Sequence, residues 1–336
     1  MNKYFRLVAW SAAASMLSLV MAAQTPAPIP SAPGAGVLVA PKPPADPFPP
    51  VNPKFFTATT PSVETVNAFL KQLWGFDPNR QWQVEAILST KAPGVAKIVV
   101  FVGEKSQSGK SQTTVFFTTP DGKHAIADNV IDFGAKPFED NRRLLEAGAD
   151  GPARGAAGKE LLIVEFSDMQ CPHCKDAQST MDQLVTDFPQ ARVVFENYPL
   201  VDIHPYAFQA AAEGVCVRKE KGDDAFAKYA QAVFDAQDGL TAANANATLD
   251  LAVTKAGADP AAAIACAKTQ ATTDAVHASM QLGKDLGVDA TPMLFVNGQP
   301  IPITNVPYEV LKRIVVYRAG LDGIQVKLQP SLKTLK

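Results

Sequence analysis

The chain has 336 residues, with 31 Lys and Arg against 33 Asp and Glu and a formal net charge of −2. This balance gives no support for nucleic-acid binding, which requires a basic surface. Four cysteines are too few for a small fold held together by disulfides, and 47% hydrophobic residues indicate cores built from apolar side chains.

The first 23 residues have the three parts of a secretory signal. Lys3 and Arg6 precede an apolar stretch over residues 7–22, which ends in small residues suited to cleavage. The stretch is short for a membrane-spanning helix, so an uncleaved anchor is the less favoured alternative. No cysteine precedes Cys171, so we expect no lipid attachment in this segment. We expect export to the periplasm or the exterior of the cell envelope, where disulfides persist.

Residues 24–53 are mostly Pro, Ala and Val. Proline lacks the backbone N–H and favours extended polyproline segments. We interpret this stretch as a semi-stiff tether, and a recognition motif for a partner is the alternative.

Residues 54–147 are expected to form a small α+β domain. Ser62 can cap a helix that runs to Trp74 with apolar residues at helical spacing. Strands are predicted at 82–88, 96–102, 113–119 and 124–130. Asp121-Gly122 predicts a hairpin turn between the last two. The run 103–111 resembles a phosphate-binding loop, but it has one residue too many between its glycines and joins two strands, so we do not interpret it as a nucleotide site.

Residues 148–159 are rich in Gly and Ala and are interpreted as a second linker, after which a second domain covers 160–325 and a tail 326–336. Its predicted elements, in order, are a strand at 161–166, a helix from 171 to about 188, a strand at 192–197, a helical block at 205–286, a strand at 292–296, a hairpin turn at 297–298, a returning strand at 299–303 and a helix at 306–318. A βαβ unit followed by a hairpin and a helix predicts an α/β, thioredoxin-like fold with an α-helical insertion.

Cys171-Pro172-His173-Cys174 carries the chemistry of this domain. The spacing places Cys171 at a helix N-terminus and Cys174 one turn further along the same face, where the two sulfurs can form and open a disulfide. Unpaired amides and the helix dipole favour an anion at Cys171 and lower its pKa below about 8.5. We expect Cys171 to be the attacking sulfur and Cys174 the resolving one, with His173 as a hydrogen-bond donor or positive charge beside the thiolate.

Half of a zinc site is the alternative interpretation of this motif. A structural zinc site needs two more ligands, usually as a second close pair. Cys216 and Cys266 lie far apart, and the histidines show no ligand spacing. Redox use is therefore favoured, and we expect neither a metal nor a cofactor.

The second half of the chain resembles the DsbA family of thiol-disulfide oxidoreductases, in the subgroup with a BdbD-like thioredoxin domain. The motifs that carry the resemblance are Glu-Phe-Ser-Asp-Met-Gln-Cys-Pro-His-Cys at 165–174, Asn-Tyr-Pro-Leu at 197–200 with His-Pro at 204–205, and Gly-Val-Asp-Ala-Thr-Pro-Met-Leu-Phe-Val-Asn-Gly at 287–298. Cys-Pro-His-Cys is the active-site tetrapeptide of DsbA-type oxidants.

The resemblance implies roles for residues outside the tetrapeptide. Pro292 matches a cis-proline loop that faces the dithiol and pairs with substrate backbone. Glu165 matches a buried acid that relays protons to Cys174; burial would raise its pKa, whereas an exposed strand residue is the alternative. Cys216 and Cys266 match the positions of a structural disulfide that bridges the helical insertion in some relatives, and free buried thiols are the alternative. His204 matches a His-Pro that opens a helix, which implies a structural role.

Two features depart from the best-known DsbA oxidants. Thr291 stands before the cis-proline, where those oxidants have Val, and can hydrogen-bond the active-site sulfur as in DsbC-like isomerases. Residues 116–132 weakly resemble the end of the dimerisation domain of DsbC and DsbG. That resemblance implies a possible homodimer through residues 54–145, in which two dithiols would face a shared cleft.

The expected function is an exported thiol-disulfide oxidoreductase that donates the Cys171–Cys174 disulfide to cysteine-containing secreted proteins. A membrane or soluble redox partner would reset the dithiol. The alternative is a dimeric isomerase or reductase like DsbC and DsbG, and a non-enzymatic chaperone is the third possibility.

Overall fold

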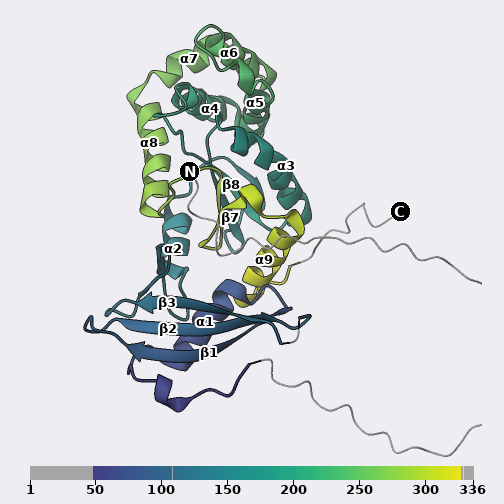
Figure 1. Cartoon of the computed structure of the whole chain (residues 1–336). Helices are drawn as coiled ribbons and strands as arrows, with labels where there is room; N and C mark the ends of the chain where they lie inside the picture. Colours follow the sequence, from purple (N-terminus) through teal and green to yellow (C-terminus); the bar gives the residue numbers. More distant parts are fainter. Residues whose placement is uncertain (1–47, 108, 327, 329–336) are drawn as a thin grey trace, which may run out of the picture. The chain divides into compact units, whose positions relative to one another are not determined.

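The computed structural model describes residues 48–107, 109–326 and 328. The chain divides into two compact units, the first made of residues up to 60 and 81–131 and the second of residues 61–80 and those from 132 onward. Figure 1 shows the elements of each unit. The predicted signal, most of the predicted tether and nearly all of the predicted tail lie outside the described residues.

The first unit is built on a five-stranded sheet in the order β1-β2-β3-β4-β5. A 3-10 helix η1 (Pro53–Phe55) precedes strands β1 (Arg80–Ser89), β2 (Ala96–Glu104), β3 (Ser111–Thr118), β4 (His124–Ile126) and β5 (Val130–Asp132). β2 and β3 are antiparallel, with Ile98 opposite Phe116 and both buried on one side. Because successive side chains of a strand point to opposite sides, one side of this sheet is buried.

The hairpin predicted at Asp121-Gly122 is present, and Gly122 has a φ of +67° that favours glycine. The single strand predicted over 124–130 is wrong. The structure has two short strands there, because the chain turns between them with the amide of Ala127 donating to the carbonyl of Asn129 at 3.0 Å.

The second unit contains a five-stranded sheet in the order β10-β9-β7-β8-β6. Its strands are β6 (Ala153–Gly155), β7 (Leu162–Ser167), β8 (Arg192–Asn197), β9 (Met293–Val296) and β10 (Gln299–Ile301). β7 is parallel to β8 and antiparallel to β9, so the predicted βαβ unit and hairpin share one sheet. The interpretation of 148–159 as a linker is wrong for β6, which pairs antiparallel with β8 and forms the sheet edge.

Helices cover both faces of this sheet. They are α2 (Glu139–Gly148), α3 (Pro172–Asp187), α8 (Gln270–Asp285) and α9 (Tyr308–Leu321). Ile163 of β7 packs in one apolar cluster with Leu184 of α3 and Leu311 of α9. Its neighbour Val164 points to the other face and packs with Leu282 of α8 and with α2. The continuous apolar run of β7 follows from burial on both faces.

Helix α1 (Val63–Trp74) begins after Ser62, whose hydroxyl caps it as predicted. Tyr317 of α9 donates a hydrogen bond to the carbonyl of Lys71 at 2.9 Å, which joins α1 to α9 within the second unit. The sequence grouped residues 54–147 in one domain, whereas the compact units place α1 and α2 with the thioredoxin-like sheet.

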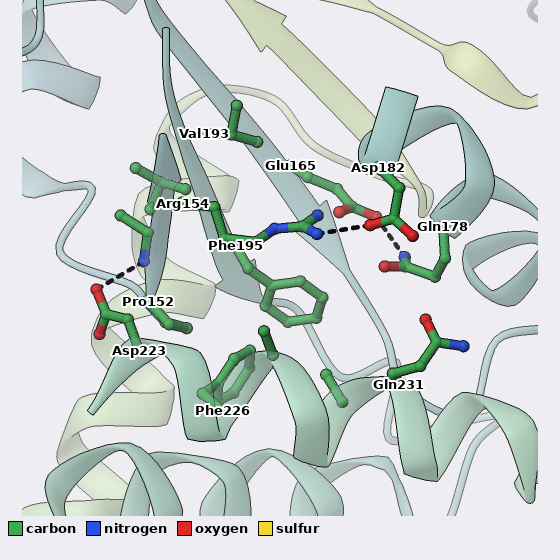
Figure 2. A pocket seen from close by; sticks show the side chains of 14 residues that line it. Pro152, Arg154, Glu165, Gln178, Asp182, Val193, Phe195, Asp223, Phe226 and Gln231 are labelled. Carbon is green, nitrogen blue, oxygen red and sulfur yellow. Dashed lines mark hydrogen bonds and ion pairs between the residues drawn. The ribbon is translucent and has the colours of Figure 1, made fainter. Parts of the chain in front are cut away.

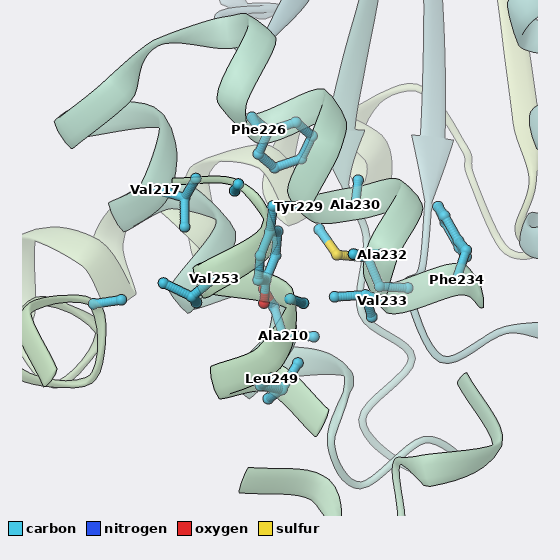
Figure 3. Close-up of a cluster of buried hydrophobic side chains, with 14 of the residues drawn as sticks. Ala210, Val217, Phe226, Tyr229, Ala230, Ala232, Val233, Phe234, Leu249 and Val253 are labelled. Carbon is cyan, nitrogen blue, oxygen red and sulfur yellow. The ribbon is translucent and has the colours of Figure 1, made fainter. Parts of the chain in front are cut away.

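The predicted helical block lies between β8 and β9. It consists of α4 (Ala207–Lys221), α5 (Asp223–Asp235), α6 (Ala245–Lys255), α7 (Pro260–Ala267) and the first part of α8, with a 3-10 turn η2 (Gln237–Gly239). Figure 3 shows its core around Tyr229, whose hydroxyl donates to the carbonyl of Ala210. Cys216 of α4 and Cys266 of α7 form a disulfide with an S–S distance of 2.06 Å. Within the described residues, no helix has the length and apolar character needed to cross a bilayer.

Candidate active site

Cys171 lies where the buried strand β7 gives way to helix α3. It is the residue that precedes the first helical position, which Pro172 occupies without leaving a buried N–H unpaired. Cys174 follows one turn into the helix and is fully buried, whereas 5% of Cys171 is exposed. Both are free thiols in this structure. The predicted placement of the two sulfurs at the start of one helix is therefore observed.

The pKa of Cys171 is lowered to about 5. The largest cause is the hydrogen bond from the Cys174 thiol, which outweighs the opposing effect of burial. The backbone amides of Cys174 and His173 and the side chain of Thr291 also stabilise the thiolate. His173 thus contributes through its amide, and its side chain is exposed. Amides at a helix N-terminus are suited to an anion, so the local fold favours ionised Cys171.

Cys174 has the opposite character. Burial raises its pKa well above the ordinary value of 9.0, and the neighbouring Cys171 sulfur raises it further. The amide of Asp168 donates to the Cys174 sulfur at 3.3 Å. Two thiols three residues apart are therefore distinguished by depth, one suited to be a thiolate and the other to hold its proton.

A loop from the far end of the domain lies against Cys171. The Cys171 sulfur lies 3.7 Å from the carbonyl oxygen of Thr291, to which the protonated thiol can donate, although 120 residues separate them. The peptide bond between Thr291 and Pro292 is cis. The motif at 287–298 singled out Thr291 and Pro292. The structure places Thr291 against Cys171, with Pro292 next to it in the chain.

Glu165 lies on β7, the strand that precedes the dithiol, and is only 2% exposed. Burial raises its pKa to about 7, despite the hydrogen bonds that it accepts. Gln178 of α3 donates from Nε2 to Glu165 at 3.2 Å and to the carbonyl of Cys174 at 3.0 Å. Gln178 therefore links the buried acid to the turn of helix that holds Cys174.

A small pocket gives Glu165 access to polar groups away from the dithiol. Figure 2 shows it between β6, β8, α3 and α5, with Arg154 and Asp182 paired at 2.5 Å. Its space of about 40 Å³ for water-sized molecules is enough for one to three waters. The pocket thus places Glu165 beside the Arg154–Asp182 ion pair, whose side chains are 33% and 57% exposed.

Asp168 is a buried residue of the motif at 165–174 to which the sequence analysis assigned no role. One of its carboxylate oxygens accepts from the amide of Leu200 and contacts Nδ1 of His204, both at 2.8 Å. The other accepts from the amide of Gln170 at 2.7 Å. Asp168 therefore ties the turn after β8 to the loop that carries Cys171, and His204 contacts Asp168 rather than either sulfur.

Residues 149–315 match the family model described as Thioredoxin. This region belongs to the thioredoxin family. The matched region contains both free thiols, Cys171 and Cys174. The thioredoxin region includes the whole five-stranded sheet of the second unit and its helical insertion.

Among solved structures, the catalytic domain of ScsC from Proteus mirabilis is similar at 22% identity, with a TM-score of 0.45 over 53% of this chain and 98% of that one. Oxidised BdbD from Bacillus subtilis is similar at 21% identity, with a TM-score of 0.46 over 51% of this chain and 93% of that one.

The curated relatives are longer proteins. Na⁺/H⁺ antiporter NhaA 1 of Salinispora arenicola is 39% identical over 69 residues, which are 20% of this chain and 10% of the antiporter. Its namesake from Mycolicibacterium vanbaalenii is 29% identical over 158 residues, which are 43% of this chain and 23% of that protein. The chain thus spans less than a quarter of the length of these relatives. The antiport activity in their names refers to those proteins.

The buried acid Glu165 should make the free energy of unfolding of the protein depend on pH. The folded pKa of Glu165, about 7, lies above the ordinary 4.5, so between these pH values the folded protein holds a proton that the unfolded chain has lost. The free energy of unfolding contributed by this group should therefore fall by about 3 kcal/mol as pH rises from 4.5 to 7. Glu165→Gln should remove that fall, as measured by urea unfolding at pH 5, 6, 7 and 8.

The matched control for this measurement is Glu139→Gln, because the Glu139 side chain is 63% exposed on α2. This variant should keep the pH dependence of the unmodified protein. Equal slopes for the Glu165 variant and the unmodified protein would show that the acid is ionised throughout.

Proposed function

We propose that the protein is an exported oxidant that donates the Cys171–Cys174 disulfide to cysteines of secreted proteins. The observation that supports this proposal is the opposition between the two thiols, with the pKa of Cys171 at about 5 and that of Cys174 raised by burial. A thiol with a low pKa is a good leaving group, so the enzyme disulfide is readily given up through Cys171.

The exchange needs two steps. A substrate thiolate attacks the Cys171 sulfur of the enzyme disulfide, and the bond to Cys174 breaks. Cys174 then takes up a proton, because its pKa is high. A second substrate thiolate attacks the substrate sulfur of the mixed disulfide, and Cys171 leaves as a thiolate. The substrate loses two electrons and two protons; the enzyme gains both electrons and one proton, and the other proton passes to solvent.

Glu165 is suited to supply and remove the proton at Cys174. Its pKa of about 7 lets it exist in both protonation states near neutral pH, and Gln178 connects it to the helical turn of Cys174. The pocket with Arg154 and Asp182 would return Glu165 to equilibrium with solvent. Thr291 and Pro292 would pair with the substrate backbone, as the DsbA resemblance implies.

The pKa of Cys171 sets a magnitude for the oxidising power. An ordinary thiol with a pKa of 9.0 is about 1% ionised at pH 7, whereas Cys171 is almost fully ionised. The reduced enzyme is therefore stabilised by about 2.7 kcal/mol at this pH, which corresponds to roughly 60 mV for a two-electron couple. Stabilising the reduced form makes the oxidised form a stronger disulfide donor.

Alkylation of the reduced protein with iodoacetamide tests whether the pKa of Cys171 is low and that of Cys174 high. The rate at Cys171 should be nearly constant above pH 6 and should fall tenfold per unit well below pH 5, whereas Cys174 should stay unreactive near neutral pH. Peptide mass spectrometry separates the two sites. Equilibration with glutathione then gives the potential. A Cys171 rate that still rises between pH 7 and 9, or a potential as low as that of thioredoxins, would contradict the oxidant.

A dimeric isomerase is the second candidate. The residue before the cis-proline favours it, because Thr291 stands where DsbC-like isomerases commonly have Thr and the best-known DsbA oxidants have Val. The resemblance of residues 116–132 to a dimerisation domain points the same way. An isomerase works from the reduced dithiol and holds its substrate in a cleft between two copies. Light scattering distinguishes the candidates, because a strict monomer at working concentration removes the cleft.

Export and partners complete the proposal. The signal-like segment at 1–23 would carry the chain to the periplasm or the exterior of the cell envelope, where its substrates acquire disulfides. A membrane-bound or soluble redox partner would reoxidise Cys171 and Cys174 after each donation. Trapping mixed disulfides with Cys174→Ala in cells would capture both groups of proteins.

A further inference from the structure

Ser167 ends strand β7 and places a hydroxyl in the interior of the protein near the dithiol. Side chains alternate along a strand, so Ser167 shares its face of the sheet with Glu165 and with Ile163, which packs against α3. Ser167 is only 1% exposed, and its hydroxyl completes no hydrogen bond to any residue that the structure describes. A buried hydroxyl without a partner costs free energy, so its presence here needs a reason.

The sulfur of Cys174 approaches Ser167 from helix α3. The amide that donates to this sulfur at 3.3 Å is that of Asp168, whose nitrogen is bonded to the carbonyl carbon of Ser167. The Ser167 side chain therefore begins close to the sulfur, on the face of the sheet that α3 covers. Glu165 lies two residues earlier on that same face. Along the strand, Ser167 thus stands between the buried acid and the buried thiol.

The Ser167 hydroxyl acts on both of these groups. Burial raises the pKa of Glu165, and among the groups that oppose burial the Ser167 side chain has the largest effect. Burial and the Cys171 sulfur raise the pKa of Cys174, whereas the Asp168 amide and the Ser167 side chain lower it. One hydroxyl therefore interacts with the acid and with the thiol between which a proton must move.

We propose that Ser167 relays the proton between Glu165 and Cys174, accepting it from one and giving its own hydroxyl hydrogen to the other. Gln178 is unsuited to this task, because it donates in both of its contacts and reaches the Cys174 carbonyl rather than the sulfur. A hydroxyl both donates and accepts, so it can pass on a proton and end unchanged. The inference deepens the exchange proposed above and rests on its assignment of Cys174 as the thiol that takes up a proton.

The relay balances in the direction of disulfide opening. A thiolate attacks the Cys171 sulfur, the bond to Cys174 breaks, and its electron pair passes to the Cys174 sulfur. That sulfur takes the hydroxyl hydrogen of Ser167 as Ser167 takes the proton of Glu165. Glu165 is left as a carboxylate and regains a proton from solvent. The reverse sequence removes the proton from Cys174 when this thiol attacks a mixed disulfide.

Opening of the Cys171–Cys174 disulfide by dithiothreitol tests the relay in the purified full protein. This small dithiol reacts with the enzyme disulfide directly, so the measurement does not depend on donation to secreted proteins. Acid quenching, alkylation and peptide mass spectrometry report how much of the disulfide remains. Ser167→Ala should slow the opening roughly a hundredfold at pH 6, because proton transfer by a positioned acid typically contributes roughly 10²–10⁴-fold.

The matched control is Ser279→Ala. It removes a buried hydroxyl of α8 that donates to another buried acid, Glu196, and it should keep the opening rate of the unmodified protein. Combining Ser167→Ala with Glu165→Gln distinguishes a relay from local packing. If both residues act in one path, the double variant should be no slower than the slower single variant, whereas independent effects multiply.

The pH profile gives a second readout. Divided by the concentration of dithiothreitol thiolate, the rate of the unmodified protein should fall about tenfold from pH 6 to pH 8. The reason is that Glu165, with a pKa of about 7, loses the proton that it supplies. The charged groups that act on Glu165 from β6 and α3, Arg154 and Asp182, have opposing effects on that pKa. In Ser167→Ala the normalised rate should be equal at the two pH values.

Two results would overturn the relay. One is a Ser167→Ala rate equal to that of the unmodified protein. The other is a loss of rate that is the same at pH 6 and pH 8 and multiplies with the loss in Glu165→Gln, which would assign Ser167 to packing alone. Failure of the proposed oxidant is distinguishable from both, because the unmodified protein would then react with dithiothreitol yet leave reduced, unfolded ribonuclease without disulfides.

Discussion

Cys171→Ser is expected to abolish disulfide donation, reducing the rate at which reduced, unfolded ribonuclease gains disulfides to the level without protein. The substituted hydroxyl cannot form the mixed disulfide through which every exchange passes. The loss should be complete, since Cys174 is buried with a raised pKa and cannot replace the missing thiolate. The fold should persist, since serine differs from cysteine only in the oxygen that replaces the sulfur.

The two positions should fail differently. When the substrate itself carries disulfides, Cys174→Ala leaves Cys171 able to attack one of them, with the other substrate sulfur leaving as a thiolate. The variant lacks the thiol that resolves this complex, so covalent adducts with substrate should accumulate. Cys171→Ser should give no adducts. Non-reducing electrophoresis after acid quenching separates these outcomes. Adducts formed through Cys174 in the Cys171 variant would show that the deeper thiol is accessible and that the roles are reversed.

The order of strands and helices from β7 to α9 was predictable because these elements carry local signals. The apolar run at 161–166 marks a strand buried on both faces, and Asn297-Gly298 marks the turn that follows β9, where Asn297 has a φ of +43°. The helical insertion is recognisable from its length alone. The cysteine spacing locates the helix start to within a residue.

Other parts depend on contacts that no local pattern records. β6 has three residues amid glycines and alanines, and it is a strand only because β8 offers it an edge. Helix α2 was not predicted; it begins after Phe138 without a side-chain cap. It packs on the face of the sheet through the buried side chain of Leu145. A short amphipathic helix of this kind needs tertiary packing to identify it.

The candidate site shows the same division. The sequence placed both thiols, Thr291 and Pro292, because they stand in recognisable motifs. It missed Asp168 and Gln178, although one stands three residues before Cys171 and the other four residues after Cys174, spacings that favour contact around a helix N-terminus. Arg154 carries no such signal, because its position near Glu165 exists only through the pairing of β6 with β8.

Removal of the second cysteine pair should have the largest effect on stability. The Cys216–Cys266 disulfide closes a sequence separation of 50 residues, and the loss of chain entropy in the unfolded state corresponds to about 4 kcal/mol at 25 °C. Cys216→Ala with Cys266→Ala should therefore lower the free energy of unfolding by up to that amount. The urea midpoint, measured without reductant, reports it. Alanine is preferred to serine because it buries no new hydroxyl in the cluster around Cys216.

The matched control removes the other pair with Cys171→Ala and Cys174→Ala, which leaves the structural disulfide intact and should shift the midpoint far less. Disulfide donation tells whether the helical insertion supports the active site, because Met169 and Cys171 belong to the same apolar cluster as α4–α6. Below its unfolding transition the Cys216 and Cys266 variant should keep its donation rate, since its active-site groups are unchanged. A midpoint equal to that of the unmodified protein would show that apolar packing around Tyr229 holds the insertion without the disulfide.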